Sequence, residues 1–396
     1  MHSSLSTVAG AVTVAILLLV AAPGTEAAYS LTKDYSGERF FDGWSYYGHY
    51  DNLTNGDIDW VNKTDSSDLT YMNAAGNAII KADNTSTVLY PNKRRSVRIQ
   101  SNDSYGIGSM WVFDFLHVPY GCSVWPAAWS QAANWPQGGE IDTFEGVNLQ
   151  STNQMALHTD SGCMASTSSS SNSFTGNLTY DNCDHDANSN SGCTVVDQNP
   201  ASYGEAFAAA GGGVWATALS SDGIKIWFFS RPDVPSDLLA SNSSAVPNPD
   251  NWGTPTASYA SSSCNIADYF APQHLVLDIT ACGDWAGAPS IINQTCPVTT
   301  NLCYTSFVLN STNFDTAYFE IPSIRVYYDE DRAAESSAQT TSSSTSPAGS
   351  AVAAASSPAG QSSSGGQNGA AGLTTSMAGS VVALIVGAAV GAWTLV

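Results

Sequence analysis

Short apolar runs recur along the chain and are separated by turn-forming residues. The runs are five to ten residues long, rich in Val, Ile, Phe, Tyr and Trp, and bounded by Gly, Asn, Ser and Asp. This pattern is typical of β-strands. We predict strands at residues 96–100, 109–118, 139–147, 154–159, 213–219, 224–230, 274–280 and 320–329.

The connections between these runs indicate antiparallel pairing. Ser221, Asp222 and Gly223 separate two of the runs and predict a hairpin turn. Helical periodicity is nearly absent, and only residues 203–210 fit a short helix. Many short strands without helices between them predict an all-β fold, either a sandwich of two antiparallel sheets or a barrel.

The two ends differ in composition from the middle of the chain. An apolar run at residues 8–22, followed by small residues, predicts a secretory signal peptide at 1–27; an uncleaved anchor is the alternative, although the run is short for a membrane span. The Ser/Thr/Ala/Gly-rich tract at 333–376 predicts a disordered stalk. The apolar residues 377–396 predict a GPI-anchor signal, with a transmembrane helix as the alternative. Residues 28–332 then form one domain.

Charge and cysteine content narrow the class of protein. A net charge of −22 argues against nucleic acid as a partner and suits a neutral ligand. An even number of cysteines behind a signal peptide predicts up to four disulfides, and we expect the local pairs Cys183–Cys193 and Cys296–Cys303. Cysteine and histidine spacings do not fit zinc, so we predict no metal. Eight glycosylation sequons predict a secreted, cell-surface glycoprotein, at Asn52, Asn62, Asn84, Asn102, Asn177, Asn242, Asn293 and Asn310.

Three acidic side chains stand within six residues: Glu140, Asp142 and Glu145. On a strand, Glu140 and Asp142 face the same side, whereas Glu145 has the opposite parity. One extra residue, a β-bulge, would bring Glu145 round to join them. The two glutamate backbones would then lie roughly 13 Å apart, and their side chains could close to the ~5 Å that retaining glycosidases use. The spacing alone leaves a solvated face or part of a calcium site as equal alternatives to catalysis.

The surrounding residues resemble a known family. WPAAW at 125–129 followed by GEIDTFEG at 139–146 is similar to glycoside hydrolase family 16, specifically the fungal endo-1,3(4)-β-glucanases, or laminarinases. Segments at 36–44, 153–163, 211–231 and 282–287 extend the resemblance over most of residues 28–330. The resemblance implies a β-jelly roll of two antiparallel sheets with the active-site cleft on the concave sheet. It also implies that Glu140 is the nucleophile, Glu145 the general acid/base, and Asp142 the carboxylate that orients the nucleophile.

Aromatic residues near the acids are candidates for sugar binding, because an indole can cover the apolar face of a pyranose. We predict this role for Trp125, Trp129, Trp135 and Trp285; burial in the core is the alternative for each. His158 lies on the strand predicted after the acidic one, so it could bond a carboxylate or a sugar hydroxyl, with a purely structural role as the alternative.

The resemblance implies a retaining endo-1,3(4)-β-glucanase that hydrolyses 1,3- and mixed-linked β-glucans by double displacement. A wall-glucan transglycosylase on the same fold and a non-catalytic glucan-binding glycoprotein are the alternatives. The expected partners are β-glucan and, through a lipid anchor, the membrane. We expect a monomer without a cofactor; a structural calcium is conceivable and is not predicted.

Overall fold

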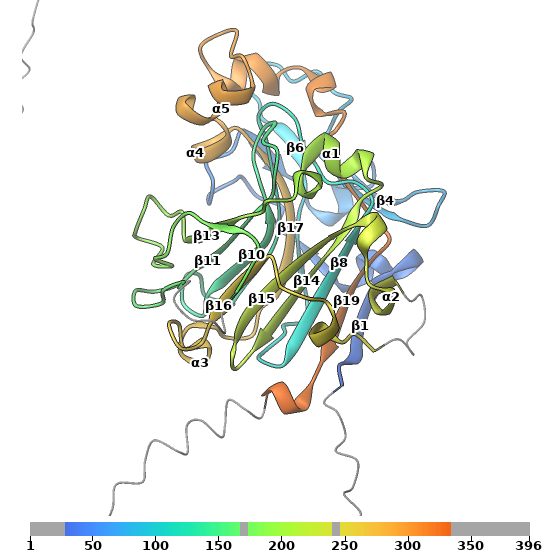
Figure 1. Ribbon diagram of the computed structural model, residues 1–396. Helices are drawn as coiled ribbons and strands as arrows, with labels where there is room; N and C mark the ends of the chain where they lie inside the picture. The colour runs from blue at the N-terminus through green and yellow to red at the C-terminus, as the bar shows by residue number, and fades with distance from the viewer. Residues whose placement is uncertain (1–27, 167–172, 240–245, 334–396) are drawn as a thin grey trace, which may run out of the picture. The chain divides into compact units, whose positions relative to one another are not determined.

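A computed structural model describes residues 28–166, 173–239 and 246–333 (Figure 1). Two large antiparallel sheets dominate it. The six-stranded sheet runs β1 (Ser30–Ser36), β19 (Ser323–Tyr328), β8 (Ser109–Phe115), β14 (Gly213–Ser220), β15 (Gly223–Ser230) and β16 (Ala257–Ala260). The eight-stranded sheet runs β12 (Asn177–Leu178), β13 (Cys193–Val196), β11 (Gln154–His158), β10 (Glu140–Glu145), β9 (Val124–Gln131), β17 (His274–Ala281), β7 (Arg98–Ser101) and β2 (Trp44–Tyr46). The prediction of an all-β sandwich of two antiparallel sheets is confirmed.

Smaller elements complete the described part of the chain. A three-stranded sheet has the order β18 (Tyr318–Ile321), β5 (Ala78–Lys81) and β4 (Thr70–Met72), and β3 (Ile58–Trp60) pairs in parallel with β6 (Arg94–Ser96). The helices are short: α1 (Gly204–Ala209), α2 (Ser236–Leu239), α3 (Ile266–Tyr269), α4 (Gly283–Ala286) and α5 (Pro289–Thr295). Among the described residues, no helix combines the length and the apolar character needed to cross a bilayer.

The core fills the space between the two large sheets. Along each strand, alternate side chains point inward, and the inward-facing residues of both sheets form one buried apolar cluster. Phe144 of β10 illustrates this packing, because its ring lies 5.1 Å from that of Trp215 on β14 and 6.5 Å from that of Phe115 on β8. The opposite, outer face of the eight-stranded sheet carries the polar side chains discussed below.

Seven of the eight predicted strands match an observed strand within two or three residues, namely β7, β8, β10, β11, β14, β15 and β17. The predicted hairpin joins β14 and β15, and the predicted short helix is α1. The predicted strand 320–329 is instead two strands in different sheets, β18 and β19, separated by Pro322. A proline supplies no backbone N–H, so it interrupts the ladder and allows the chain to pass from one sheet to the other.

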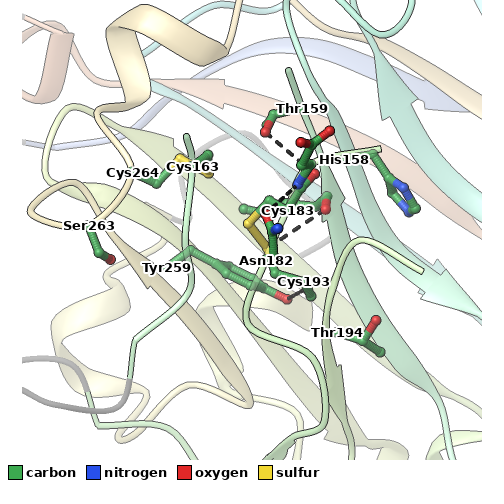
Figure 2. Close-up of a disulfide and its surroundings, with 12 residues drawn as sticks. His158, Thr159, Cys163, Asn182, Cys183, Cys193, Thr194, Tyr259, Ser263 and Cys264 are labelled. Atoms are coloured by element: carbon green, nitrogen blue, oxygen red, sulfur yellow. Dashed lines mark hydrogen bonds between the residues drawn. A yellow bond between two sulfur atoms is a disulfide. The ribbon is translucent and has the colours of Figure 1, made fainter. Parts of the chain in front are cut away.

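All eight cysteines are paired, as Cys122–Cys296, Cys163–Cys264, Cys183–Cys193 and Cys282–Cys303. The local prediction Cys183–Cys193 is confirmed (Figure 2). The local prediction Cys296–Cys303 is wrong: Cys296 directly follows α5 and meets Cys122, whereas Cys303 meets Cys282 at the start of α4. Proximity in the sequence was a poor guide because each partner is brought close by tertiary packing.

Several predictions fall on other parts of the chain. The signal peptide at 1–27, the hydrophobic tail at 377–396, the sequon at Asn242 and all of the stalk except Ala333 lie outside the described residues. Of the sequon asparagines within the described residues, Asn84 is half-buried and the others are exposed. These remain predictions.

Candidate active site

Strand β10 carries the three acids and contains the predicted bulge. Its pairing with β11 shifts register between Asp142 and Glu145, and its pairing with β9 shifts between Asp142 and Phe144. Thr143 and Phe144 both point into the core: Thr143 Oγ1 lies 2.7 Å from Thr217 Oγ1 of β14, and Phe144 is fully buried. Because two consecutive residues face inward, Glu145 returns to the outer face that Glu140 and Asp142 occupy.

Two glycines place the start of β10 against the neighbouring chain. Gly138 and Gly139 have φ angles of +81° and +76°. A Cβ on Gly139 would lie 2.5 Å from Phe270 Cδ1 and 2.9 Å from the Tyr269 carbonyl oxygen. Only glycine fits both the left-handed conformation and this close approach, so these residues fix where the acidic strand begins.

Glu140 is bound by a tryptophan and faces a histidine. The Nε1–H of Trp135 donates to Glu140 Oε2. Across the ladder, Glu140 is paired with His158 of β11. Ligand-type atoms of Glu140, Asp142 and His158 all lie within 4.8 Å of one another. Trp135 is 38% exposed, so its ring remains available to a ligand beside Glu140.

Asp142 is buried between the other two acids. Its Oδ2 lies 3.3 Å from His158 Nε2 and is otherwise without a hydrogen-bond partner. The side chains of Asp142 and His158 are both almost fully buried. A buried carboxylate and imidazole at this distance form an ion pair in which each favours the charged form of the other.

Glu145 has its own set of hydrogen-bond partners. Trp125 Nε1 donates to its Oε1 at 2.8 Å, and Gln154 Nε2 donates to its Oε2 at 3.5 Å. Its backbone N–H donates to Asn153 Oδ1 at 2.9 Å. The two glutamates are therefore held by different side chains: Glu140 by Trp135, in the loop before β10, and Glu145 by Trp125 of β9 and Gln154 of β11.

Burial sets the protonation of this cluster. Burial first, and the adjacent Asp142 second, raise the pKa of Glu140. Burial raises the pKa of Asp142 and raises that of Glu145 to about 7, while the bond from Trp125 opposes the shift at Glu145. Burial alone would lower the pKa of His158, but the surrounding carboxylates raise it to about 10. Glu145 can thus carry a proton near neutral pH, as a general acid must.

Asp278, Arg98 and Trp129 form a second polar group on the same face, and sequence reasoning missed the first two. Asp278 of β17 accepts from Trp129 Nε1 at 3.0 Å, and the Arg98 guanidinium lies 5.2 Å from the Trp129 ring centroid. Burial raises the pKa of Asp278 to about 7. The sequence did contain a signal for Asp278. It is an acid within the apolar run at 274–280, and an acid in such a strand must face away from the core.

The predicted aromatic residues gather near the acids to different extents. Trp125 is half-buried, and its ring lies edge-on to that of Trp285, with centroids 5.4 Å apart. Trp129 is only 6% exposed and packs with Ala127 and Val276, so its ring lies buried against the sheet on this face. His158 lies on β11 beside the acids, as the sequence predicted.

The described residues contain two groups whose donor atoms are close enough for a metal ion. One is Glu140, Asp142 and His158, in which the donor atoms already pair with one another and with Trp135. The other is Asp184, His185 and Asp186 on a loop, where His185 Nδ1 pairs with Asp186 Oδ1 at 3.4 Å. We assign a metal to neither group, since acidic clusters of this kind are common without one.

The arrangement provides two separately held, half-buried carboxyl groups on the outer face of one sheet, with an indole ring next to each. Such a pair suits acid-assisted nucleophilic displacement at an acetal carbon, and the rings suit a sugar ligand.

Comparisons with known proteins agree with this geometry. Residues 44–327 match the family model described as the XgeA-like, catalytic GH16 domain. A probable glycosidase of Schizosaccharomyces pombe is 39% identical over 76% of this chain and 69% of its own length. The endo-1,3(4)-β-glucanase xgeA of Emericella nidulans is 33% identical over 83% of this chain and 52% of its own length. The chain therefore spans about half to two thirds of these curated relatives.

Two solved structures are similar over their full length and over 76% of this chain. Laminarinase 16A from Phanerochaete chrysosporium, described with two β-glucans in its donor and acceptor sites, is 38% identical with a TM-score of 0.70. An elongating GH family 16 β-1,3-glucosyltransferase is 35% identical with a TM-score of 0.68. These likenesses confirm the jelly-roll prediction.

Proposed function

Because this chain belongs to glycoside hydrolase family 16, as an XgeA-like catalytic domain, we propose that it is a retaining endo-1,3(4)-β-glucanase. The observation that carries the proposal is the bulge in β10, which places Glu140 and Glu145, both half-buried, on the same outer face with separate hydrogen-bond partners. The similarity to fungal endo-1,3(4)-β-glucanases supports β-glucan as the substrate class.

The first step uses both glutamates. Ionised Glu140 attacks the anomeric carbon, and the bond from that carbon to the leaving glycosidic oxygen breaks as Glu145 donates its proton to the oxygen. In the second step Glu145, now ionised, takes a proton from water, and the water oxygen displaces Glu140 from the same carbon. Two inversions leave the configuration retained.

Asp142 and His158 support Glu140 in this scheme. Glu140 must be ionised to attack, although burial and the adjacent Asp142 favour its protonated form. Asp142 is close enough to Glu140 to accept its proton. The positive charge of His158 then offsets the negative charge that remains on Glu140. Trp135 donates to Glu140 and so stabilises the carboxylate.

The experiment is product analysis on laminarin and lichenan with matched variants. The wild-type protein should release reducing ends of initial β configuration, as seen by proton NMR. Glu140→Gln and Glu145→Gln should each lower kcat by at least roughly a thousandfold. Glu38→Gln, a substitution at an exposed acid on a short 3-10 helix, is the control and should retain full activity. A folded Glu140→Gln variant with wild-type activity would refute the assignment.

A transglycosylase is the second candidate, and the similarity to an elongating β-1,3-glucosyltransferase favours keeping it. Its reaction differs from hydrolysis only in the second step, in which a sugar hydroxyl instead of water displaces Glu140 from the anomeric carbon. Products longer than the starting laminari-oligosaccharide would identify this activity. Their absence at high oligosaccharide concentration would assign the protein as a hydrolase.

We propose that the enzyme works outside the cell, tethered by a lipid anchor. Four disulfides are typical of a protein that folds in an oxidising compartment. The composition of residues 333–396 supports a glycosylated stalk and a GPI signal. Release of activity from intact cells by phosphatidylinositol-specific phospholipase C would support the anchor, and resistance to it would argue against this attachment.

A further inference from the structure

A disulfide-closed loop, residues 183–193, lies against the acid cluster. Cys183 and Cys193 join its two ends, and Cys193 is the first residue of β13, which pairs with β11. The loop is also bonded to Thr159, the residue after His158: the Thr159 N–H donates to the Cys183 carbonyl at 2.8 Å, and the His185 N–H donates to the Thr159 carbonyl at 3.0 Å. Figure 2 shows the disulfide next to Thr159 and His158.

Two residues of this loop contact the His158 ring. Asn190 Oδ1 lies 3.1 Å from His158 Nδ1, on the opposite side of the ring from the Nε2 that faces Asp142. A Cβ on Gly192 would lie 3.0 Å from both Cε1 and Nε2 of His158 and 2.4 Å from the Leu157 carbonyl oxygen. The backbone of the loop therefore packs directly against the ring.

The conformation of the loop is demanding. Asn188, Ser189 and Asn190 have φ angles of 51°, 57° and 60°, and that of Gly192 is 61°. Non-glycine residues rarely adopt this region, and each one costs about 1 kcal/mol or more. The disulfide and the bonds to Thr159 hold the loop in this shape, which places the Asn190 amide at His158.

We propose that Asn190 is a positioning residue for the reaction: its carbonyl oxygen accepts from Nδ1 of His158 and holds the ring so that Nε2 faces Asp142. This inference rests on the proposed function. With an acceptor at each nitrogen, the imidazole is held as a cation that donates at both ends. That cation is the positive charge beside Glu140 and Asp142.

The charged groups that face His158 are Glu140, Asp142 and Glu145, all on β10. The two loop contacts, Asn190 and Gly192, are neutral. The imidazolium lowers the pKa of each of the three carboxyls. If the ring turns away or loses its charge, these three pKa values should therefore rise. The reaction would then require a higher pH to ionise Glu140.

The test compares Asn190→Gly with Asn188→Gly. Glycine accepts the positive φ at both positions, so neither substitution adds strain, and only the first removes the acceptor at His158. We expect Asn190→Gly to move the acidic limb of kcat/KM on laminarin upward by roughly half a pH unit, which is a roughly threefold loss on that limb. Asn188→Gly should match the wild type, and Asn190→Asp, which keeps the acceptor, should not show this upward shift.

A second readout does not depend on activity. Imidazole NMR, with the His158 signal assigned by its loss in His158→Gln, should show a lower pKa for His158 in Asn190→Gly than in the wild type. An unchanged pKa and an unchanged acidic limb would overturn the proposal, as would a loss of activity that is uniform across pH. Absence of glucan hydrolysis in the wild type would instead refute the proposed function, and NMR would still decide the role of Asn190.

Discussion

Burial and the Trp125 indole shift the pKa of the Glu145 carboxyl in opposite directions. Burial raises its pKa to about 7, and the Trp125 Nε1–H, which donates at 2.8 Å, favours the ionised form. The proposed general acid thus has its pKa lowered, against the effect of burial, by a residue that is also a candidate for sugar binding. The hydrogen bond from Trp125 therefore affects both the position of the Glu145 carboxyl and its protonation.

Replacing Trp125 by Phe separates these two roles. The ring remains, but the donor is lost, so the ionised form of Glu145 is less stable and its pKa rises. We expect the basic limb of kcat/KM, which reports protonated Glu145 in the proposed mechanism, to move upward by roughly half to one pH unit. Trp285→Phe leaves this bond in place and should not move the limb; a downward shift in Trp125→Phe would contradict the account.

At the residue scale, the sequence revealed the acids and the side chains that contact them directly, Trp125, Trp135 and His158, but not Asp278 or Asn190. Glu140, Asp142 and Glu145 are close in sequence and carry a recognisable motif, so their clustering follows from strand geometry. Asp278 and Asn190 come from β17 and from a loop far along the chain. Their contacts depend on strand order and on loop conformation, which local pattern does not specify.

Among the elements, β10 owes its placement to the glycines before it. Gly139 combines a positive φ with backbone and ring atoms closer than a Cβ could tolerate. A change there would act on the whole strand, because both glutamates follow within six residues.

Gly139→Ala should therefore reduce both stability and activity. Gly76→Ala is the matched control, because Gly76 has a φ of +80° and open space where its Cβ would be. The control should cost about 1 kcal/mol from backbone strain alone, whereas Gly139→Ala should cost roughly 2 to 4 kcal/mol because Phe270 and Tyr269 must also move. Denaturant unfolding measures the difference; equal losses would show that the close approach does not matter.

Sequence pattern predicted the strands better than their ends or their pairing. The bulge in β10 followed from the parity of three acids, because only an extra residue lets them share a face. Strand β9 was not identified, since Pro126 lies within it and the run before the acids contains no simple alternation. The switch between β18 and β19 at Pro322 required knowledge of two separate sheets.

Across the whole molecule, buried acids should make stability depend on pH. Burial raises the pKa of Glu145 and Asp278 to about 7 and that of Asp197 to about 6, above the ordinary values of 4.5 for glutamate and 3.8 for aspartate. The native state therefore binds more protons than the unfolded state between these values, so stability falls as pH rises through the window. Asp83 acts in the opposite direction. Burial would raise its pKa, but hydrogen bonds from Thr85 and Ser86 outweigh this effect and lower the pKa to about 2, so the stability that Asp83 contributes is lost as the pH falls toward 2.

We expect the melting temperature to be highest near pH 4 to 5 and to fall toward pH 7.5. Each extra bound proton contributes a slope of about 1.4 kcal/mol per pH unit. Asp278→Asn should flatten the decline, because that side chain no longer titrates. Calorimetry across this range provides the measurement, and a melting temperature that rises from pH 4.5 to 7.5 would contradict the assignment of these acids as buried and protonated.

The proposed mechanism depends most on Glu140 as the residue that bonds to the sugar. Reaction with a 2-deoxy-2-fluoro laminari-oligosaccharide bearing an activated leaving group, followed by digestion and mass spectrometry, identifies the modified side chain directly. We predict a single glycosyl adduct on Glu140, formed with loss of activity. An adduct on Glu145 or Asp142, or inactivation without any adduct on β10, would contradict the proposed mechanism.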